Sequence, residues 1–139
     1  MKLKTFTDGG ARGNPGPAAL GVAIYDEQHI LIKEFGEYIG ETTNNQAEYG
    51  ALLAALTEAH TMGADEVECF LDSELVVKQM KGEYRVKNAE LALIYMKIWN
   101  LVKKFKKVSF RHIPREKNKV ADAQVNIAID AFLSHRHKR

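Results

Sequence analysis

The sequence has one cysteine and no long apolar run. Cys69 lies in the apolar stretch VECFL and has no partner for a disulfide within the chain, which fits a buried thiol in a reducing compartment. No stretch reaches the roughly 20 apolar residues of a membrane-spanning helix. The opening MKLKTF is too short and too polar for the core of a signal peptide. We therefore expect a cytoplasmic protein that does not enter a membrane.

Internal repeats and low-complexity segments are also lacking. The 139 residues are 45% hydrophobic, which is enough to bury a core in one domain. We expect a single domain over residues 1–139 and a monomer. The polar end SHRHKR predicts a flexible tail over about residues 134–139.

Charge is divided unevenly along the chain, although the net charge is only +2. Residues 1–80 hold 13 acidic and 5 basic side chains, whereas residues 81–119 hold 12 basic and 3 acidic ones. The basic segment favours a polyanionic partner, because Lys and Arg that neutralise phosphates release counterions. Two solvated helix faces would explain it equally well, so charge alone leaves both interpretations open.

Hydrophobic periodicity predicts an α/β protein. The pattern indicates strands at 2–8, 18–26, 29–40, 66–72 and 108–112, and helices at 42–63, from 73, 89–107 and 119–133. Because strands separated by helices pair in parallel, this order predicts a mixed sheet with helices packed on it. In the last helix, Val120, Gln124, Ile127 and Ala131 share one predicted face, and we expect Gln124 to bury an unpaired amide there.

Four carboxylates stand at the boundaries of predicted elements: Asp8, Glu48, Asp72 and Asp122. The ends of neighbouring parallel strands adjoin, so Asp8 and Asp72 are expected to meet at one edge of the sheet. Oxygen ligands without a Cys or His set suit Mg²⁺ or Mn²⁺, and a hydrolytic two-metal centre follows. Taken singly, Asp8 is equally explained as a turn residue, Asp72 as a helix cap and Asp122 as a first-turn acid.

Longer stretches resemble the type I ribonuclease H family in order and spacing over nearly the whole chain: TDGGARGNPGPA, TTNNQAEYGALLAAL, LDSELVVKQMKGEYRVKN and RHIPREKNKVADAQVN. The resemblance implies a ribonuclease H-like fold, a five-stranded mixed β-sheet flanked by α-helices. It also implies an endonuclease that cuts the RNA strand of RNA/DNA hybrids and leaves 3′-hydroxyl and 5′-phosphate ends. Two Mg²⁺ ions, with Mn²⁺ as a possible substitute, would be held by Asp8, Glu48, Asp72 and Asp122.

The resemblance implies further roles along the substrate. His112 matches a histidine that assists proton transfer or product release, and Asn118 matches an asparagine near the active site. Thr43 matches a contact to a phosphate of the DNA strand. Contacts along the RNA strand fall on Gly9, Gly10, Asn14, Asn44, Asn45 and Gln46. The glycines are expected to leave room for the nucleic-acid backbone beside Asp8.

Several members of the family carry a basic, Trp-rich protrusion after the third carboxylate, and here only GEYRVKNAE occupies that place. Substrate grip is therefore expected from basic residues elsewhere in this half of the chain: Lys81, Arg85, Lys87, Lys103, Lys104, Lys106 and Lys107. The alternative function is a module of the same fold that binds hybrids or double-stranded RNA without cutting them. The presence of all four carboxylates argues against that alternative.

Overall fold

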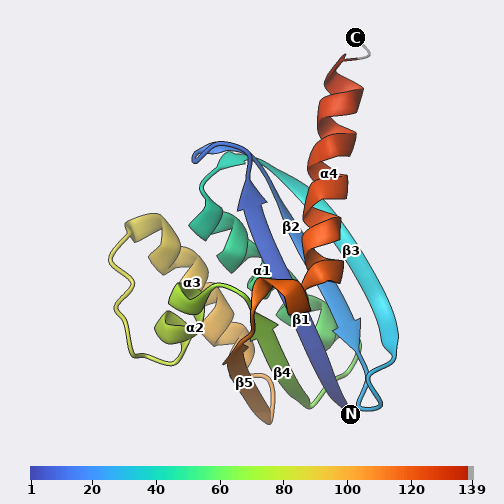
Figure 1. Ribbon diagram of the computed structural model, residues 1–139. Helices are drawn as coiled ribbons and strands as arrows, with labels where there is room; N and C mark the ends of the chain where they lie inside the picture. The colour runs from blue at the N-terminus through green and yellow to red at the C-terminus, as the bar shows by residue number, and fades with distance from the viewer. Residues whose placement is uncertain (138–139) are drawn as a thin grey trace.

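The computed structural model describes residues 1–137, and the side chains of residues 1–136. Its five strands form one mixed sheet in the order β3-β2-β1-β4-β5 (Figure 1). The strands are β1 (Lys2–Ala11), β2 (Gly16–Tyr25), β3 (Leu31–Thr42), β4 (Glu66–Leu71) and β5 (Lys107–His112). The first three form an antiparallel meander, and β4 and β5 run parallel to β1. The predicted mixed sheet is confirmed.

Helices cover both faces of this sheet. They are α1 (Asn44–Thr61), α2 (Glu74–Met80), α3 (Ala89–Val102) and α4 (Lys119–His137), and a short 3₁₀ turn, η1 (Arg115–Lys117), precedes the last one. Neighbouring residues of β1 point to opposite faces, and Gly9 faces Ala47 of α1 while Gly10 faces Val125 of α4. The helices α1 and α4 therefore pack on opposite sides of the sheet (Figure 1). Within residues 1–137, no helix is both long and apolar enough to cross a membrane.

The helix α1 forms where its apolar spacing predicts it. Thr43 caps its N-terminus by accepting a hydrogen bond from the backbone N–H of Gln46 at 3.2 Å. Gly63, which follows the helix, takes the left-handed φ of 86° that favours glycine. The predicted inward face is buried throughout: Ala47, Ala51, Leu52, Ala55, Leu56 and Ala59.

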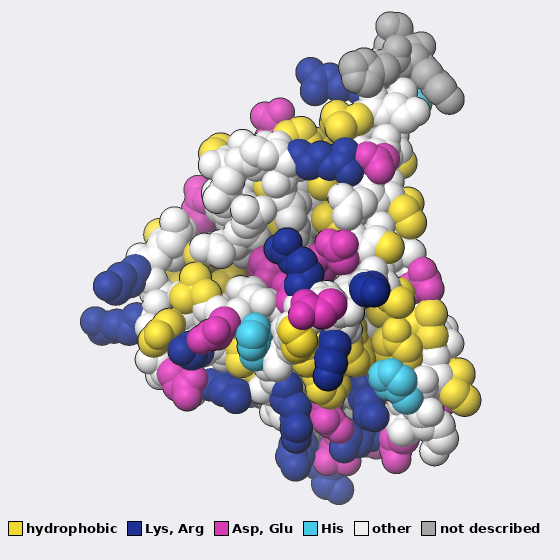
Figure 2. All heavy atoms as spheres, viewed as in Figure 1, with side chains coloured by type: hydrophobic (Ala, Val, Ile, Leu, Met, Phe, Trp, Pro, Cys, Tyr) yellow, Lys and Arg dark blue, Asp and Glu magenta, His cyan; other side chains and the backbone are white. Residues whose placement is uncertain are grey.

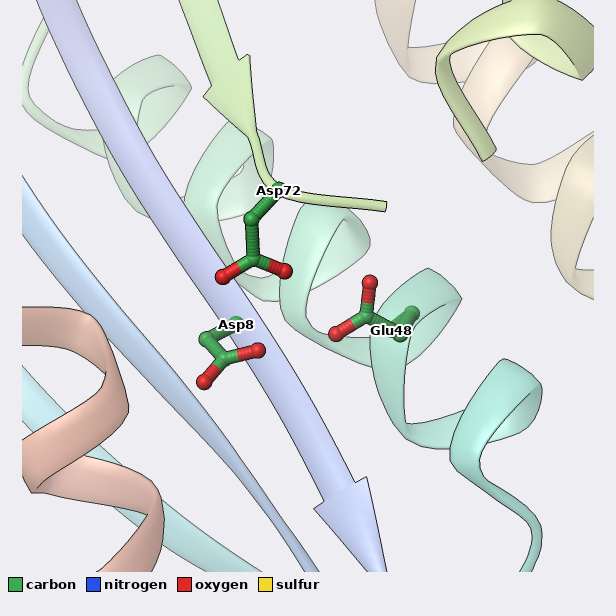
Figure 3. Close-up of side chains that lie close together, drawn as sticks. All are labelled: Asp8, Glu48 and Asp72. Carbon is green, nitrogen blue, oxygen red and sulfur yellow. The ribbon is translucent and has the colours of Figure 1, made fainter. Parts of the chain in front are cut away.

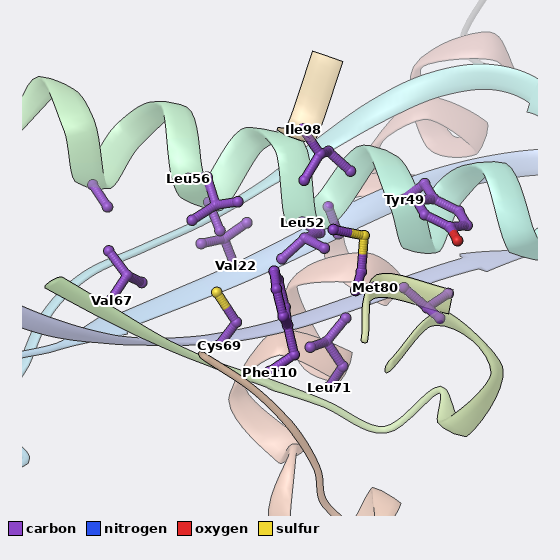
Figure 4. Close-up of a cluster of buried hydrophobic side chains, with 14 of the residues drawn as sticks. Val22, Tyr49, Leu52, Leu56, Val67, Cys69, Leu71, Met80, Ile98 and Phe110 are labelled. Atoms are coloured by element: carbon purple, nitrogen blue, oxygen red, sulfur yellow. The ribbon is translucent and has the colours of Figure 1, made fainter. Parts of the chain in front are cut away.

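The main core lies between the sheet and the α1–α3 side (Figure 4). Val67, Cys69 and Leu71 alternate along β4 and point into it, where they meet Leu52 and Leu56 of α1. Cys69 is fully buried, and this burial raises the pKa of its thiol to about 12. The prediction of a buried thiol is confirmed.

Some boundaries differ from those that the sequence predicts. The strand β1 continues past Asp8 to Ala11, and β2 begins at Gly16, so the glycine-rich stretch is mostly hairpin. The helix α3 ends at Val102 instead of 107. The helix α4 runs to His137, so residues 134–137 are helical, and the flexibility of this end stays a prediction. Residues 138–139 of that predicted tail lie outside the described residues.

The buried face of α4 is also not the predicted one. Its inward residues are Ala121, Val125 and Ile129, whereas Ile127 is 57% exposed. The reason is a close approach, since a Cβ on Gly21 of β2 would lie 2.1 Å from the carbonyl oxygen of Ala121. The amide Nε2 of Gln124 instead donates to Glu34 Oε1 at 2.7 Å on the exposed side, so the expected unpaired buried amide is wrong.

Candidate active site

Three carboxylates converge where β4 ends. Thr7 and Leu71 form the last pair between β1 and β4, while β1 continues for four more residues. Asp8 and Asp72 directly follow that pair, and Glu48 reaches them from α1 (Figure 3). One oxygen from each of the three carboxylates lies within 4.8 Å of the others. The predicted meeting of Asp8 and Asp72 at this edge is confirmed.

Gly9 sets the position of Glu48. A Cβ on Gly9 would lie 2.2 Å from the backbone carbonyl carbon of Ala47, so α1 can rest on β1 only because Gly9 has no side chain. The backbone N–H of Gly9 donates to Glu48 Oε1 at 2.7 Å. This amide is therefore used within the protein, and the missing side chain makes room for α1. Gly9 and Gly10 both line the cleft described below, and their contact with substrate stays a prediction.

Asp8 and Glu48 lie in an environment that disfavours their charge. Burial raises the pKa of Asp8, and the neighbouring carboxylates of Glu48, Asp72 and Asp122 raise it further. Burial also raises the pKa of Glu48, although hydrogen bonds from Asp8 and the Gly9 amide oppose that shift. A divalent cation between these oxygens would offset the repulsion, and a donor set made only of carboxylates suits Mg²⁺ or Mn²⁺.

A cleft of about 410 Å³ opens above the three carboxylates. Asp122, in the first turn of α4, lines this cleft, but its oxygens fall outside the group of three. Figure 2 shows acidic side chains gathered at the centre of this face, with Lys and Arg side chains beside them. All four predicted carboxylates thus border one cleft, and Asp8, Glu48 and Asp72 form its closest group.

Asn118 holds Asp72 in place. Its Nδ2 donates to Asp72 Oδ2 at 3.0 Å and to the carbonyl oxygen of Thr7 at 2.7 Å. The residue is only 1% exposed. Asn118 therefore lies beside the three carboxylates, near the active site as the resemblance implies, and its buried amide acts by positioning a carboxylate.

The amides near the start of α1 fasten the glycine hairpin to the helix. Asn14 Oδ1 accepts from the backbone N–H of Asn44 at 3.0 Å, and Asn44 Oδ1 accepts from the backbone N–H of Ala11 at 2.8 Å. Gln46 accepts from Thr42 Oγ1 at 2.8 Å and donates to Glu90. Among the predicted RNA contacts, the side chains that line the cleft come from Asn44 and Asn45.

The structure does not bring the remaining predicted residues into the cleft. His112 is the last residue of β5 and pairs with Leu71, so it lies at the same sheet edge as Asp72. Its exposed side chain lines a separate depression beside Met80 and Trp99. Lys81, Arg85 and Lys87 lie on and after the end of α2, where their side chains are exposed.

Four polar residues of the cleft were not predicted as site residues: Arg12, Ser73, Arg115 and Asn126. Ser73 directly follows Asp72, and Asn126 lies one helical turn after Asp122, so chain spacing alone could have indicated these two. Arg12 reaches the cleft because its guanidinium bonds Asp130 and Asn126 of α4, a contact across 118 and 114 residues that no local pattern indicates.

Comparison with known proteins places this site in a family. The family model described as reverse transcriptase-like matches residues 6–128. Ribonuclease HI of Halobacterium salinarum is 40% identical over 129 residues, which are 93% of this chain and 65% of the relative. The crystal structure of ribonuclease H1 from this archaeon superposes with a TM-score of 0.92 over 94% of this chain and 99% of that chain, at 40% identity. The chain belongs to the type I ribonuclease H family.

Two further comparisons define how far this ribonuclease H resemblance extends. A ribonuclease H1 from a compost metagenome, solved in complex with an RNA/DNA hybrid, is 48% identical, with a TM-score of 0.90 over 94% of this chain and 99% of that chain. A bifunctional protein of Mycobacterium tuberculosis is 40% identical over 132 residues. Those residues are 94% of this chain but only 36% of the mycobacterial protein, so the chain spans about a third of that relative.

Proposed function

We propose that the protein is an endoribonuclease that hydrolyses the RNA strand of RNA/DNA hybrids and leaves 3′-hydroxyl and 5′-phosphate ends. The observation that carries this proposal is the carboxylate group of Asp8, Glu48 and Asp72, whose oxygens lie within 4.8 Å of one another at the mouth of a cleft. The similar ribonuclease H1 solved with a hybrid supports the choice of substrate.

The same carboxylates would hold the catalytic metal. Asp8, Glu48 and Asp72 are the first ligands, and Asp122 borders the cleft where a second ion would sit with substrate bound. Two bound Mg²⁺ ions, or Mn²⁺ in their place, would activate a water and stabilise the leaving 3′-oxygen. The protein's contribution is to keep the oxygens together, through the Gly9 amide on Glu48 and the Asn118 amide on Asp72.

Substrate recognition is assigned to the wall of the cleft formed by the start of α1. Asn44 and Asn45 present amides there, and such groups distinguish RNA from DNA by hydrogen bonds to 2′-hydroxyls. Thr43, beside them, is proposed to meet a phosphate of the DNA strand. The exposed Lys81, Arg85 and Lys87 would bind more distant phosphates. His112 is proposed to assist proton transfer or product release from the adjacent end of β5.

The test is incubation of the protein with labelled RNA/DNA, RNA/RNA and DNA/DNA duplexes, with Mg²⁺ and with EDTA. We expect cleavage of the RNA strand of the hybrid in Mg²⁺ and none in EDTA. Binding of the hybrid or of double-stranded RNA without cleavage would favour the non-cleaving module instead. A cytoplasmic location and a monomeric state remain predictions.

A further inference from the structure

The last turns of α4 extend beyond the sheet (Figure 1). The buried contacts of this helix with the sheet end at Ile129, and partly buried Phe132 and Leu133 follow. From Ser134 to Arg136 the side chains are exposed while the backbone stays helical. The polar end of α4 covers no part of the core, so packing against the core does not explain why the helix continues this far.

Two contacts brace α4 just before this extension. On one side, Arg12 from the β1–β2 hairpin reaches Asp130 Oδ1 at 2.6 Å and Asn126 Oδ1 at 3.2 Å. On the other side, the ring of Phe132 stacks on Tyr38 of β3 with 3.8 Å between centroids. The direction of the extension is therefore fixed by the sheet on both sides.

The extension continues the face of α4 that borders the cleft. Asp122, Asn126 and Ile129 line the cleft, and at 100° per residue Leu133 and Arg136 fall on the same side of the helix. Arg136 lies 14 residues beyond Asp122, which corresponds to about 21 Å along the axis. Asp130 is the last acidic residue of α4, and its charge is paired with Arg12, so the extension is basic.

We propose that this extension is a nucleic-acid contact in which Arg136 binds a backbone phosphate of the duplex outside the catalytic cleft. The inference rests on the proposed function and deepens it. At about 3.4 Å of axial rise for each base pair, a distance of about 21 Å corresponds to roughly six base pairs from the carboxylates. A long duplex would reach the extension, and a short one centred on the cleft would not.

Binding of fluorescent hybrids of about 8 and about 20 base pairs, measured in EDTA over a range of salt, tests the proposal. We expect Arg136→Ala to weaken binding of the long hybrid about 3- to 10-fold and to lower its salt slope by about one, with the short hybrid unaffected. Arg136→Lys should restore most of the affinity, because a phosphate accepts either cation. Lys33→Ala is the matched control and should leave both hybrids unchanged, because Lys33 pairs with Glu58 in the second half of α1, away from the cleft at its start.

The outcomes separate this proposal from the proposed function. Equal binding of the long hybrid by wild type and Arg136→Ala would overturn the contact, even if the wild type cuts hybrids. The contact is also overturned if Arg136→Ala changes only the melting temperature, because a basic residue then serves only the helix C-terminus. A wild type that neither binds nor cuts hybrids would overturn the proposed function itself.

Discussion

At the scale of single residues, the position of Glu48 depends on what Gly9 lacks. The resemblance identifies the four acids, but it does not indicate that Gly9 makes room for α1, because a contact between β1 and α1 lies outside any local pattern. The structure shows that Gly9 brings the helix within bonding distance and then donates its amide to Glu48. Two buried acids are thereby forced together beside Asp72.

This forced arrangement predicts a pH-dependent stability in metal-free buffer. The pKa of Asp8 is raised in the folded protein, so folding favours its protonated form, and the associated stability is lost as pH rises above the ordinary value near 4. The melting temperature without metal should therefore fall from pH 5 to pH 9. Asp8→Asn should flatten this fall and raise the melting temperature at pH 8 by about 3–6 °C, measured by thermal unfolding.

The control for this prediction is Glu27→Gln, which removes the same charge from an exposed turn. It should leave the pH profile of the wild type unchanged. Addition of Mg²⁺ should stabilise the wild type more than Asp8→Asn at pH 8, since the cation binds the charged form. A wild-type melting temperature that rises steadily from pH 5 to pH 9 would contradict the account of Asp8.

The proposed role of His112 in proton transfer or product release needs a direct test. Its side chain lies outside the cleft, at the end of β5 next to the strand that carries Asp72. Replacement by alanine should lower kcat about 10²-fold with little change in hybrid binding, because a proton carrier acts on the reacting groups. Multiple-turnover kinetics check this, and an unchanged kcat would make His112 a structural strand residue.

At the scale of elements, periodicity predicts which segments form helices better than it predicts which side of them is buried. The apolar face of α1 is evident from its spacing alone, and all six of its residues are buried. In α4 the predicted face is one residue off, because the approach of Ala121 to Gly21 decides the contact. Gly21 and Ala121 are 100 residues apart in the chain, so no sequence pattern near Gln124 indicates their contact.

Two groups of basic residues lie at opposite ends of the parallel strands. Composition does not indicate this separation. Lys107 begins β5 opposite Glu66, whereas Asp72 follows the far end of β4 and Asp8 lies beside that end, within β1. A strand of six residues spans about 20 Å. Lys106 and Lys107 therefore lie at the edge away from the cleft, while Lys81, Arg85 and Lys87 follow α2, which begins next to Asp72.

Charge reversal at these two sets should consequently differ in effect. The triple change of Lys81, Arg85 and Lys87 to Glu should weaken hybrid binding and reduce its salt slope by up to about one for each phosphate that is no longer neutralised. The double change Lys106→Glu with Lys107→Glu should leave the slope within error of the wild type. Salt titrations of hybrid binding measure both, and the reverse result would place the substrate on the other edge.

At the scale of the whole molecule, the helices cover both faces of the mixed sheet and leave the end of β4, where the carboxylates lie, open to the cleft. The strand β1 extends past the end of β4, so Glu48 from α1 on one face and Asp122 from α4 on the other both border the cleft beside Asp8 and Asp72. The sequence order and the family resemblance predict this topology. The lengths of the helices and strands could not be predicted from the sequence. These lengths determine the open end of the sheet, the separate depression at His112 and the extension of α4.

The most direct test of the carboxylate centre is hybrid cleavage in Mg²⁺ by Asp72→Asn compared with Glu74→Gln. Both substitutions remove one negative charge, but Asp72 belongs to the group of three, whereas Glu74 is exposed and pairs with Lys78 at 2.8 Å. We expect Asp72→Asn to abolish cleavage without lowering the melting temperature, and Glu74→Gln to cut at near the wild-type rate. Near-native cleavage by Asp72→Asn, or equal loss in both variants, would contradict the account.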